Sequence, residues 1–200
     1  MQACRLAALD LACRRGDRVL FRGLGFALGQ GEALHLAGPN GVGKSSLIRI
    51  LAGLLRPYAG SVEREGALAL ADERPALDGH LPLGAALEFW RTFDGADHAT
   101  LDAAVETLGL RDLLDVPVRY LSTGQRKRAA LARTLLAGAP VWLLDEPLNG
   151  LDSASAAVVE DLVARHIAQG GIAVIASHQP FALSGMARLE LARFEPAEAA

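Results

Sequence analysis

The segment from Gly38 to Ser46 constrains the fold of this chain more than any other, because it has the form of a phosphate-binding loop. It matches G-x-x-x-x-G-K-[ST] and consists of Gly38, Pro39, Asn40, Gly41, Val42, Gly43, Lys44, Ser45 and Ser46. The apolar run before it, residues 33–37, predicts a buried strand. Apolar residues at helical spacing follow it, which predicts a helix that runs through Leu54 until Pro57 stops it. A strand, a glycine loop and a helix in this order favour a phosphate site over a chance match on a glycine turn.

Each residue type in this loop suits the binding of a nucleoside triphosphate. Glycines at 38, 41 and 43 allow bends that point successive backbone N–H groups at phosphate oxygens. The N-terminus of the following helix adds a partial positive charge. We expect Lys44 to reach the β- and γ-phosphates and the Ser45 hydroxyl to bind Mg²⁺. The sequence therefore predicts an ATP site with magnesium.

A second element that fits phosphate chemistry is an apolar strand, predicted over residues 141–144, that runs into Asp145 and Glu146. An aspartate at the end of such a strand can hold Mg²⁺ through its water shell. A glutamate one residue later can polarise a water for attack on the γ-phosphorus. Acidic residues at strand ends are common, so this pair carries weight only together with the phosphate loop.

A polar pentapeptide lies shortly before that strand. It consists of Leu121, Ser122, Thr123, Gly124 and Gln125. The helix that follows is basic, with Arg126, Lys127, Arg128 and Arg133. Ser122 is a good N-cap, and the helix start is a second possible anion site. The alternative is an ordinary cap on a helix with a solvated basic face, but the position before Asp145 and Glu146 favours a role in the site.

One of the five histidines, His178, follows a strand predicted at residues 172–176. A histidine at the carboxyl end of a parallel strand faces the crevice where ligands bind. From there its side chain could hydrogen-bond a γ-phosphate. The other histidines lack such a context and are interpreted as structural: His35, His80, His98 and His166.

Strand and helix signals alternate along the chain, which predicts an α/β fold of the P-loop NTPase class with a largely parallel sheet. The remaining strands are expected at residues 5–12, 18–28 and 67–71, the first two forming an N-terminal β region, and further helices at 85–91 and 101–108. We interpret the chain as a single domain, 1–200, with a core of about 1–73 and 138–195. An inserted helical lobe would cover about 74–137, although periodicity alone also allows additional core helices.

The order of these motifs resembles that of the ATP-binding-cassette (ABC) ATPases over residues 5–194. The resemblance implies a nucleotide-binding domain with an antiparallel N-terminal region. It makes residues 121–125 the family signature, Asp152 the acidic residue of the D-loop, and His178 the switch histidine. In this family two cassettes face each other head to tail, and the signature of one completes the ATP site of the other. A homodimeric ATPase is therefore implied.

Two positions depart from the family pattern. The glutamine that usually links the core to the helical lobe is absent where it is expected, at Asp72-Glu73-Arg74-Pro75. Glu73 could approach the metal, whereas Arg74 could not coordinate it. An aromatic residue that often stacks on adenine is also missing, and the matching place lies near Arg15. The guanidinium of Arg15 could lie on the base or belong to the surface, and the sequence leaves both interpretations open.

Composition narrows the possible partners. The formal net charge is −3 and the basic residues are scattered along the chain with acidic residues between them, so nucleic acid is not expected as the main ligand. We find neither a run of eighteen apolar residues nor a signal segment, so we expect a soluble, cytoplasmic chain that meets a membrane only through a partner. The two cysteines, Cys4 and Cys13, show no metal-ligand spacing and are expected to be reduced bystanders.

Within the family, the short chain and the segment Ser177-His178-Gln179-Pro180 resemble the ATP-binding subunits of haem exporters in cytochrome c maturation. This resemblance implies an integral membrane transporter subunit as partner. It also implies that this chain itself lies peripherally at the cytoplasmic face of the inner membrane. Three alternatives remain: another small exporter, a soluble cassette ATPase that acts on nucleic acid or the ribosome, and a degenerate cassette. Soluble cassette ATPases usually carry two cassettes or a coiled-coil insertion. A degenerate cassette, which binds ATP only as a structural element, is disfavoured by the presence together of Lys44, Asp145, Glu146 and His178.

Overall fold

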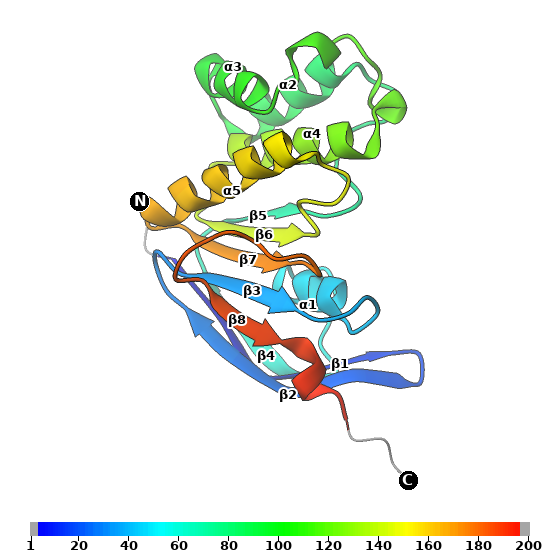
Figure 1. Ribbon diagram of the computed structural model, residues 1–200, viewed down its shortest axis with the longest axis vertical. Coiled ribbons are helices and arrows are strands. Elements are labelled where there is room, and N and C mark those ends of the chain that lie inside the picture. The colour runs from blue at the N-terminus through cyan, green and yellow to red at the C-terminus, as the bar shows by residue number, and fades with distance from the viewer. Residues whose placement is uncertain (1–3, 197–200) are drawn as a thin grey trace.

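The computed structural model describes residues 4–196 and contains two sheets that lie one above the other (Figure 1). The antiparallel sheet has the order β2-β1-β4 and consists of β1 (Arg5–Arg15), β2 (Arg18–Leu28) and β4 (Ala59–Glu65). The second sheet has the order β5-β6-β7-β3-β8 and consists of β3 (Ala33–Ala37), β5 (Leu68–Ala71), β6 (Val141–Asp145), β7 (Ile172–Ala176) and β8 (Ala187–Glu190). The helices are α1 (Lys44–Leu51), α2 (Leu83–Asp94), α3 (His98–Thr107), α4 (Thr123–Leu136) and α5 (Ser153–Ala168).

The larger sheet is parallel, as the sequence predicts. Its three central strands β3, β6 and β7 are buried at every position, which explains why they read as continuous apolar runs without alternation. Every pair in this sheet is parallel. Parallel strands end at the same edge, and the register aligns Asp145 at the end of β6 with Ala176 at the end of β7. The residues that follow β3, β6 and β7 therefore meet at one edge.

Helix α1 joins the two sheets. Leu47, Ile48 and Leu51 are buried completely and pack in one apolar cluster with residues of both sheets. Phe21 of β2 and Leu143 of β6 belong to the same cluster. Burial of such side chains stabilises each by about 1.5–3 kcal/mol relative to exposure. The packing fixes the N-terminus of α1, and with it the phosphate loop, against the parallel sheet.

The expectation that the helix after the phosphate loop continues through Leu54 to Pro57 is wrong. The helix ends at Leu51, because Gly53 adopts the left-handed conformation with φ +78°. The Gly53 N–H donates to the Ile50 carbonyl and the Leu54 N–H to the Arg49 carbonyl, a Schellman ending. The side chain of Leu54 is therefore 68% exposed. The glycine outweighs the apolar spacing that suggested a longer helix.

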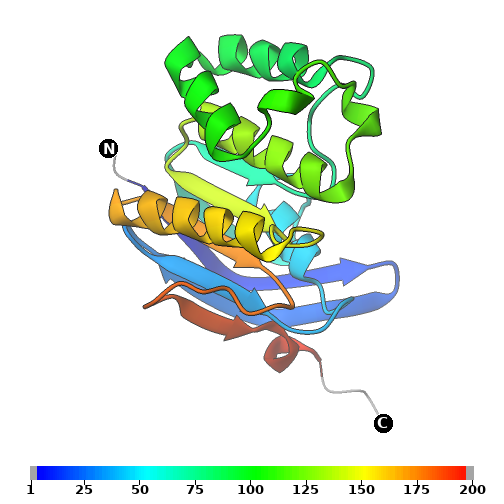
Figure 2. The same cartoon turned by 45° about the horizontal axis from the view of Figure 1, so that its top comes forward.

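Helices α2, α3 and α4 gather at the end of the molecule opposite the antiparallel sheet (Figures 1 and 2). Helices α2 and α3 pack against α4, which in turn contacts β5. Leu83, Leu87 and Leu131 contribute to their shared core. Both predicted helices exist here and begin earlier than their apolar spacing indicates. Helix α2 begins after Pro82, and α3 begins after Asp97, whose side chain caps it by accepting from the Thr100 N–H.

Two strands were missed by the sequence reading. Strand β4 is almost entirely exposed and polar, and it forms only because β1 offers it an antiparallel edge. Strand β8 is a short, partly exposed edge strand beside β3. Strand β1 also continues beyond residue 12, because the tight turn at Gly16 keeps Arg15 paired with Arg18. Among the described residues, none of the helices combines the length and the apolarity that a membrane crossing requires.

A buried histidine in the core links stability to pH. The ring of His166 stacks on Trp142 with a centroid distance of 3.9 Å, and its Nε2 lies 3.2 Å from the Ile172 carbonyl oxygen. Burial lowers the pKa of His166 below its ordinary value. The unfolded chain therefore binds a proton that the folded chain does not, and stability falls as the pH drops below about 6.5.

We expect the contribution of His166 to the free energy of unfolding to decrease by up to about 1.4 kcal/mol per pH unit in that window. The measurement is urea unfolding of the wild type and of His166→Phe, which keeps a ring on Trp142, at a series of pH values from 7.5 to 5. The variant should show a shallower pH dependence. Equal slopes for the two proteins would contradict the assignment.

Candidate nucleotide-binding and catalytic site

The loop between β3 and α1 has the backbone that its glycines predict. Gly38, Gly41 and Gly43 have φ values of +142°, +81° and +112°, a region that favours glycine. A Cβ at Gly43 would also lie 3.3 Å from atoms of Leu20 and Phe21, so this position is crowded as well as left-handed. Lys44 then begins α1. The loop thus has the shape in which backbone N–H groups can surround an anion.

A cavity of about 330 Å³ lies beside this loop. Its lining comes from the loop, the β1–β2 hairpin and the segments after β5 and β6: Leu20, Asn40, Gly41, Gly43, Lys44, Ser45, Ser46, Glu73, Glu146 and Asn149. Arg15 is exposed in the hairpin and does not belong to this lining. Leu20 of the same hairpin does line the cavity. Nothing in the sequence indicated this role, because Leu20 looks like an ordinary apolar strand residue.

Lys44 connects the loop with the acidic end of β6. Its ammonium group donates hydrogen bonds to the carbonyl oxygens of Gly38 at 2.8 Å and Pro39 at 3.2 Å. The same nitrogen lies 3.5 Å from Oε1 of Glu146. Both side chains are almost fully buried, so this attraction is screened less than one at the surface.

Glu146 is held from several sides. Its φ of +48° lies in the left-handed region, which costs about 1–3 kcal/mol for a residue other than glycine. Its N–H donates to the Ala176 carbonyl at 2.8 Å. Its Oε2 lies 2.9 Å from Nδ1 of His178, which is exposed on its other side. The structure therefore brings Lys44, Glu146 and His178 together, although they come from three separate segments.

Asp145 lies deeper, with 2% of its surface exposed. Burial raises the pKa of its carboxyl group above the ordinary value, while a hydrogen bond with Ser45 and the charge of Lys127 oppose that shift. Its Oδ1 has no hydrogen-bond partner within the described part of the chain. A hydroxyl beside a carboxylate with a free oxygen is the donor type that Mg²⁺ prefers. Residues 4–196 contain no cluster of three or more His, Cys, Asp or Glu side chains that could hold a metal ion by themselves. A Mg²⁺ ion bound with a nucleotide does not need such a cluster, because it takes most of its ligands from phosphate and water.

The pentapeptide at residues 121–125 forms the start of α4. Ser122 Oγ accepts from the Gln125 N–H at 3.2 Å, and Gln125 Oε1 accepts from the Ser122 N–H at 2.8 Å, a complete capping box. The predicted cap is confirmed. Leu121 is buried, Ser122 and Thr123 are exposed, and a Cβ on Gly124 would meet the Gly150 carbonyl oxygen at 2.5 Å. None of residues 121–125 lines the 330 Å³ cavity.

Asp152 is the N-cap of α5. Its carboxylate accepts from the Ser155 N–H at 2.7 Å, and this bond lowers the pKa of Asp152. The residue is exposed at the edge of the segment 149–152, against which the start of α4 packs through Gly124. The structure thus places Asp152 beside the pentapeptide segment and leaves it available to other molecules.

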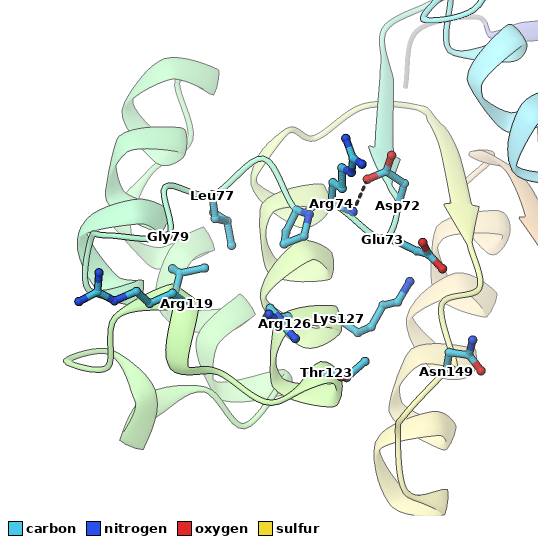
Figure 3. A pocket seen from close by; sticks show the side chains of 12 residues that line it. Asp72, Glu73, Arg74, Leu77, Gly79, Arg119, Thr123, Arg126, Lys127 and Asn149 are labelled. Carbon is cyan, nitrogen blue, oxygen red and sulfur yellow. Dashed lines mark hydrogen bonds between the residues drawn. The ribbon is translucent and has the colours of Figure 1, made fainter.

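In the segment that lacks the expected glutamine, neighbouring side chains point to different parts of the molecule. Glu73 lines the cavity beside the phosphate loop, and Asp72 forms an ion pair with Arg49 of α1 at 3.4 Å. Figure 3 shows Glu73 and Arg74 pointing in different directions at the edge of a second cavity of about 460 Å³, between this segment and α4. Lys127 lines that cavity too, with its ammonium group 2.9 Å from the Asp145 carbonyl oxygen. The basic helix pattern gave no sign that Lys127 is buried.

The chain and its fold are similar to those of known proteins. Residues 21–149 match the family model described as ABC transporter. The chain is similar to a cytochrome c biogenesis ATP-binding export protein CcmA from Novosphingobium aromaticivorans, with 61% identity over 98% of this chain and 100% of the relative. A protein of the same name from Sphingopyxis alaskensis is 52% identical over 92% of this chain and 95% of its own. A solved ATP-binding subunit of an ABC transporter superposes with a TM-score of 0.77 at 23% identity, over 86% of this chain and 79% of that one, and supports the fold.

Proposed function

This chain belongs to the ABC transporter family, within the group of cytochrome c biogenesis ATP-binding export proteins, and on this premise we propose that it drives haem export with ATP hydrolysis. The chain is an ATPase of this family. The observation that carries the proposed mechanism is the meeting of Lys44, Glu146 and His178 beside the phosphate loop. Haem as cargo rests on the resemblance alone, because we identify no haem-ligand motif among the residues.

The proposed chemistry assigns each group one task. Backbone N–H groups of residues 38–46 and the Lys44 ammonium hold the β- and γ-phosphates. Glu146 orients and polarises a water, which attacks the γ-phosphorus as the bond to the ADP oxygen breaks. The water proton passes toward the Glu146 carboxylate. His178 holds that carboxylate through its 2.9 Å contact. In the proposed mechanism it exchanges this contact for one with a γ-phosphate oxygen when ATP binds.

We also propose a binding site for the Mg²⁺ ion that accompanies ATP. Ser45 and Asp145 would hold it, and the ion would neutralise charge on the phosphate oxygens. We expect Asp145→Asn to bind ATP in EDTA about as well as the wild type, but to lose most of the gain in affinity that Mg²⁺ brings. Titration with a fluorescent ATP analogue, with and without Mg²⁺, measures this gain directly. An unchanged gain in the variant would exclude Asp145 as a magnesium-binding residue.

We further propose a head-to-tail homodimer in which residues 121–125 of one subunit, with Asp152, complete the ATP site of the other. Support comes from the exposed N-terminus of α4, which lies outside the cavity beside the same chain's phosphate loop. A helix N-terminus with its cap is a suitable partner for the charge on a γ-phosphate. In the same proposal, residues of about 74–137 form a helical lobe on a core of about 1–73 and 138–195.

The ABC transporter family implies a membrane partner, and we propose that it is an integral subunit of the CcmB type. The chain would then lie at the cytoplasmic face of the inner membrane and touch it only through this subunit. A net charge of −3 supports a protein partner over nucleic acid. An ATPase subunit of a different small exporter would use the same residues and is the second candidate.

The partner is tested by purification of tagged Glu146→Gln protein from membranes of the source organism in mild detergent with ATP. We expect an integral membrane protein of the cytochrome c assembly machinery to come with it, and Ser122→Arg, which should not form the ATP dimer, to retain less of it. A permease for another cargo would overturn the haem assignment and keep the ATPase. Failure to retain any membrane protein would favour the soluble alternative.

A further inference from the structure

The chain uses lysine at only two positions. Of its 20 basic residues, all except Lys44 and Lys127 are arginines. Both lysines are almost fully buried, with 5% and 9% of their surface exposed. Lys44 has its place in the phosphate loop, whereas nothing in the proposed mechanism uses Lys127. A buried ammonium group needs a partner, because burial without one is unfavourable by several kcal/mol.

The partner of Lys127 is a main-chain atom of the catalytic segment. Its Nζ donates to the carbonyl oxygen of Asp145 at 2.9 Å. Figure 3 shows the side chain reaching from α4 toward the segment that follows β6, between Glu73 and Asn149. The carboxylates of Asp72, Glu73, Asp145 and Glu146 all lie near enough to act on its charge. The ammonium group is therefore attracted by four carboxylates, while its hydrogen bond goes to a backbone carbonyl oxygen.

The bonded carbonyl belongs to the peptide group that joins Asp145 to Glu146. The N–H of the same group donates to the Ala176 carbonyl at 2.8 Å. Lys127 and Ala176 therefore hold the two polar atoms of one peptide group, from a helix on one side and from β7 on the other. This group directly precedes the left-handed Glu146, whose φ is +48°. A rotation of the peptide would move the Glu146 carboxylate away from Lys44 and His178.

We propose that Lys127 is a positioning residue for hydrolysis: it clamps the Asp145–Glu146 peptide and so fixes the direction of the Glu146 carboxylate. This inference rests on the proposed role of Glu146. It also gives the start of α4 a physical connection to the base in its own chain, because Lys127 follows Gln125 of the capping box by two residues. A change in the tilt of α4 is transmitted to Glu146 through one hydrogen bond.

Lysine suits this position better than arginine. The ammonium is compact and can donate to one carbonyl while carboxylates surround it, whereas a guanidinium is a wide, planar fork. The test therefore uses Lys127→Met, which keeps the length and removes the donor. We expect kcat to fall by roughly 10- to 100-fold, the loss typical of a misplaced catalytic group, while the Kd for ATP stays within about threefold.

The matched control is Arg128→Met. Arg128 is the next residue of α4, and it also donates to main-chain carbonyls, but to those of Leu108 at 2.7 Å and Gly109 at 2.9 Å and not to that of Asp145. Its loss should lower the melting temperature and leave kcat within about threefold of the wild type. Equal losses of kcat in both variants would mean that Lys127 only supports the fold of α4.

A chemical rescue restores the donor alone. In Lys127→Cys, treatment of the unfolded protein with 2-bromoethylamine before refolding yields a thioether analogue of lysine. The protein also carries Cys4→Ala and Cys13→Ala, because position 127 is as buried as the two native cysteines and burial cannot direct the reagent. Mass spectrometry verifies the modification, and the Cys4→Ala/Cys13→Ala protein with Lys127 intact, treated and refolded in the same way, is the control. We expect most of the lost kcat to return. The proposal is overturned if Lys127→Met retains wild-type kcat, if its ATP affinity falls in parallel with kcat, or if the modified protein stays inactive. If the wild-type protein itself does not hydrolyse ATP, the proposed function fails, and this inference fails with it.

Discussion

Replacement of Glu146 by glutamine should nearly abolish ATP turnover while leaving ATP binding intact. The substitution keeps the size of the side chain and removes the carboxylate that would polarise the attacking water. We expect kcat to fall by on the order of 10²- to 10⁴-fold, the range attributed to a positioned general base, with the Kd for ATP within about threefold of the wild type. Phosphate release under saturating ATP and Mg²⁺ gives kcat, and titration with a fluorescent ATP analogue gives Kd.

The control for this experiment is Glu63→Gln, which removes a carboxylate on the exposed strand β4, where it pairs with Arg5 at 3.0 Å. Its turnover should match that of the wild type. Because the Glu146→Gln protein binds ATP without hydrolysing it, it should also elute as a dimer when ATP is present. Normal phosphate release by Glu146→Gln would remove Glu146 from the proposed mechanism.

The second large effect is expected at Ser122. Its side chain is exposed at the start of α4, outside the cavity of its own phosphate loop, so Ser122→Arg should spare binding of ATP to the monomer. In the proposed dimer the arginine would occupy the place where the partner's γ-phosphate meets the helix. We expect hydrolysis to fall by roughly 10²- to 10³-fold, comparable to the loss of a transition-state donor. Ser122→Thr, which keeps the cap and the size, should remain active.

Mixing the two inactive variants distinguishes an ATP site that two subunits share from a site formed within one chain. In a head-to-tail heterodimer, the Ser122→Arg subunit supplies an intact Glu146 and the Glu146→Gln subunit supplies an intact signature. One of the two sites of each heterodimer is then complete. Random pairing makes about half of the dimers heterodimers, so a mixture prepared before ATP is added should regain up to about a quarter of wild-type turnover per subunit. No recovery, together with weakened ATP binding by the Ser122→Arg monomer, would place the signature in its own chain's site.

The local parts of the site follow from the sequence because their chemistry is local. The glycines at 38, 41 and 43 identify the loop, and the apolar run before Asp145 identifies a buried strand whose end must face the loop in a parallel sheet. The cap at Ser122 follows from the same kind of short-range rule. Each of these features depends on a few neighbouring residues and on one rule of backbone geometry.

Other features depend on distant contacts and could not be predicted in this way. The end of α1 is decided by Gly53, and strand β4 by the edge that β1 offers it. Leu20 reaches the cavity beside the loop because its strand packs against the loop at Gly43. Lys127 looks like part of a solvated basic face, and only the fold shows that its ammonium group lies on the Asp145 carbonyl.

The central claim is that this ATPase serves the assembly of c-type cytochromes, and staining for covalently bound haem tests it most directly. The gene is deleted in the source organism, and membrane and periplasmic fractions are separated by denaturing electrophoresis and stained for haem peroxidase activity. We predict that the bands of c-type cytochromes disappear, that the wild-type gene restores them, and that the Glu146→Gln gene does not. Bands of wild-type intensity in the deletion strain would contradict the claim.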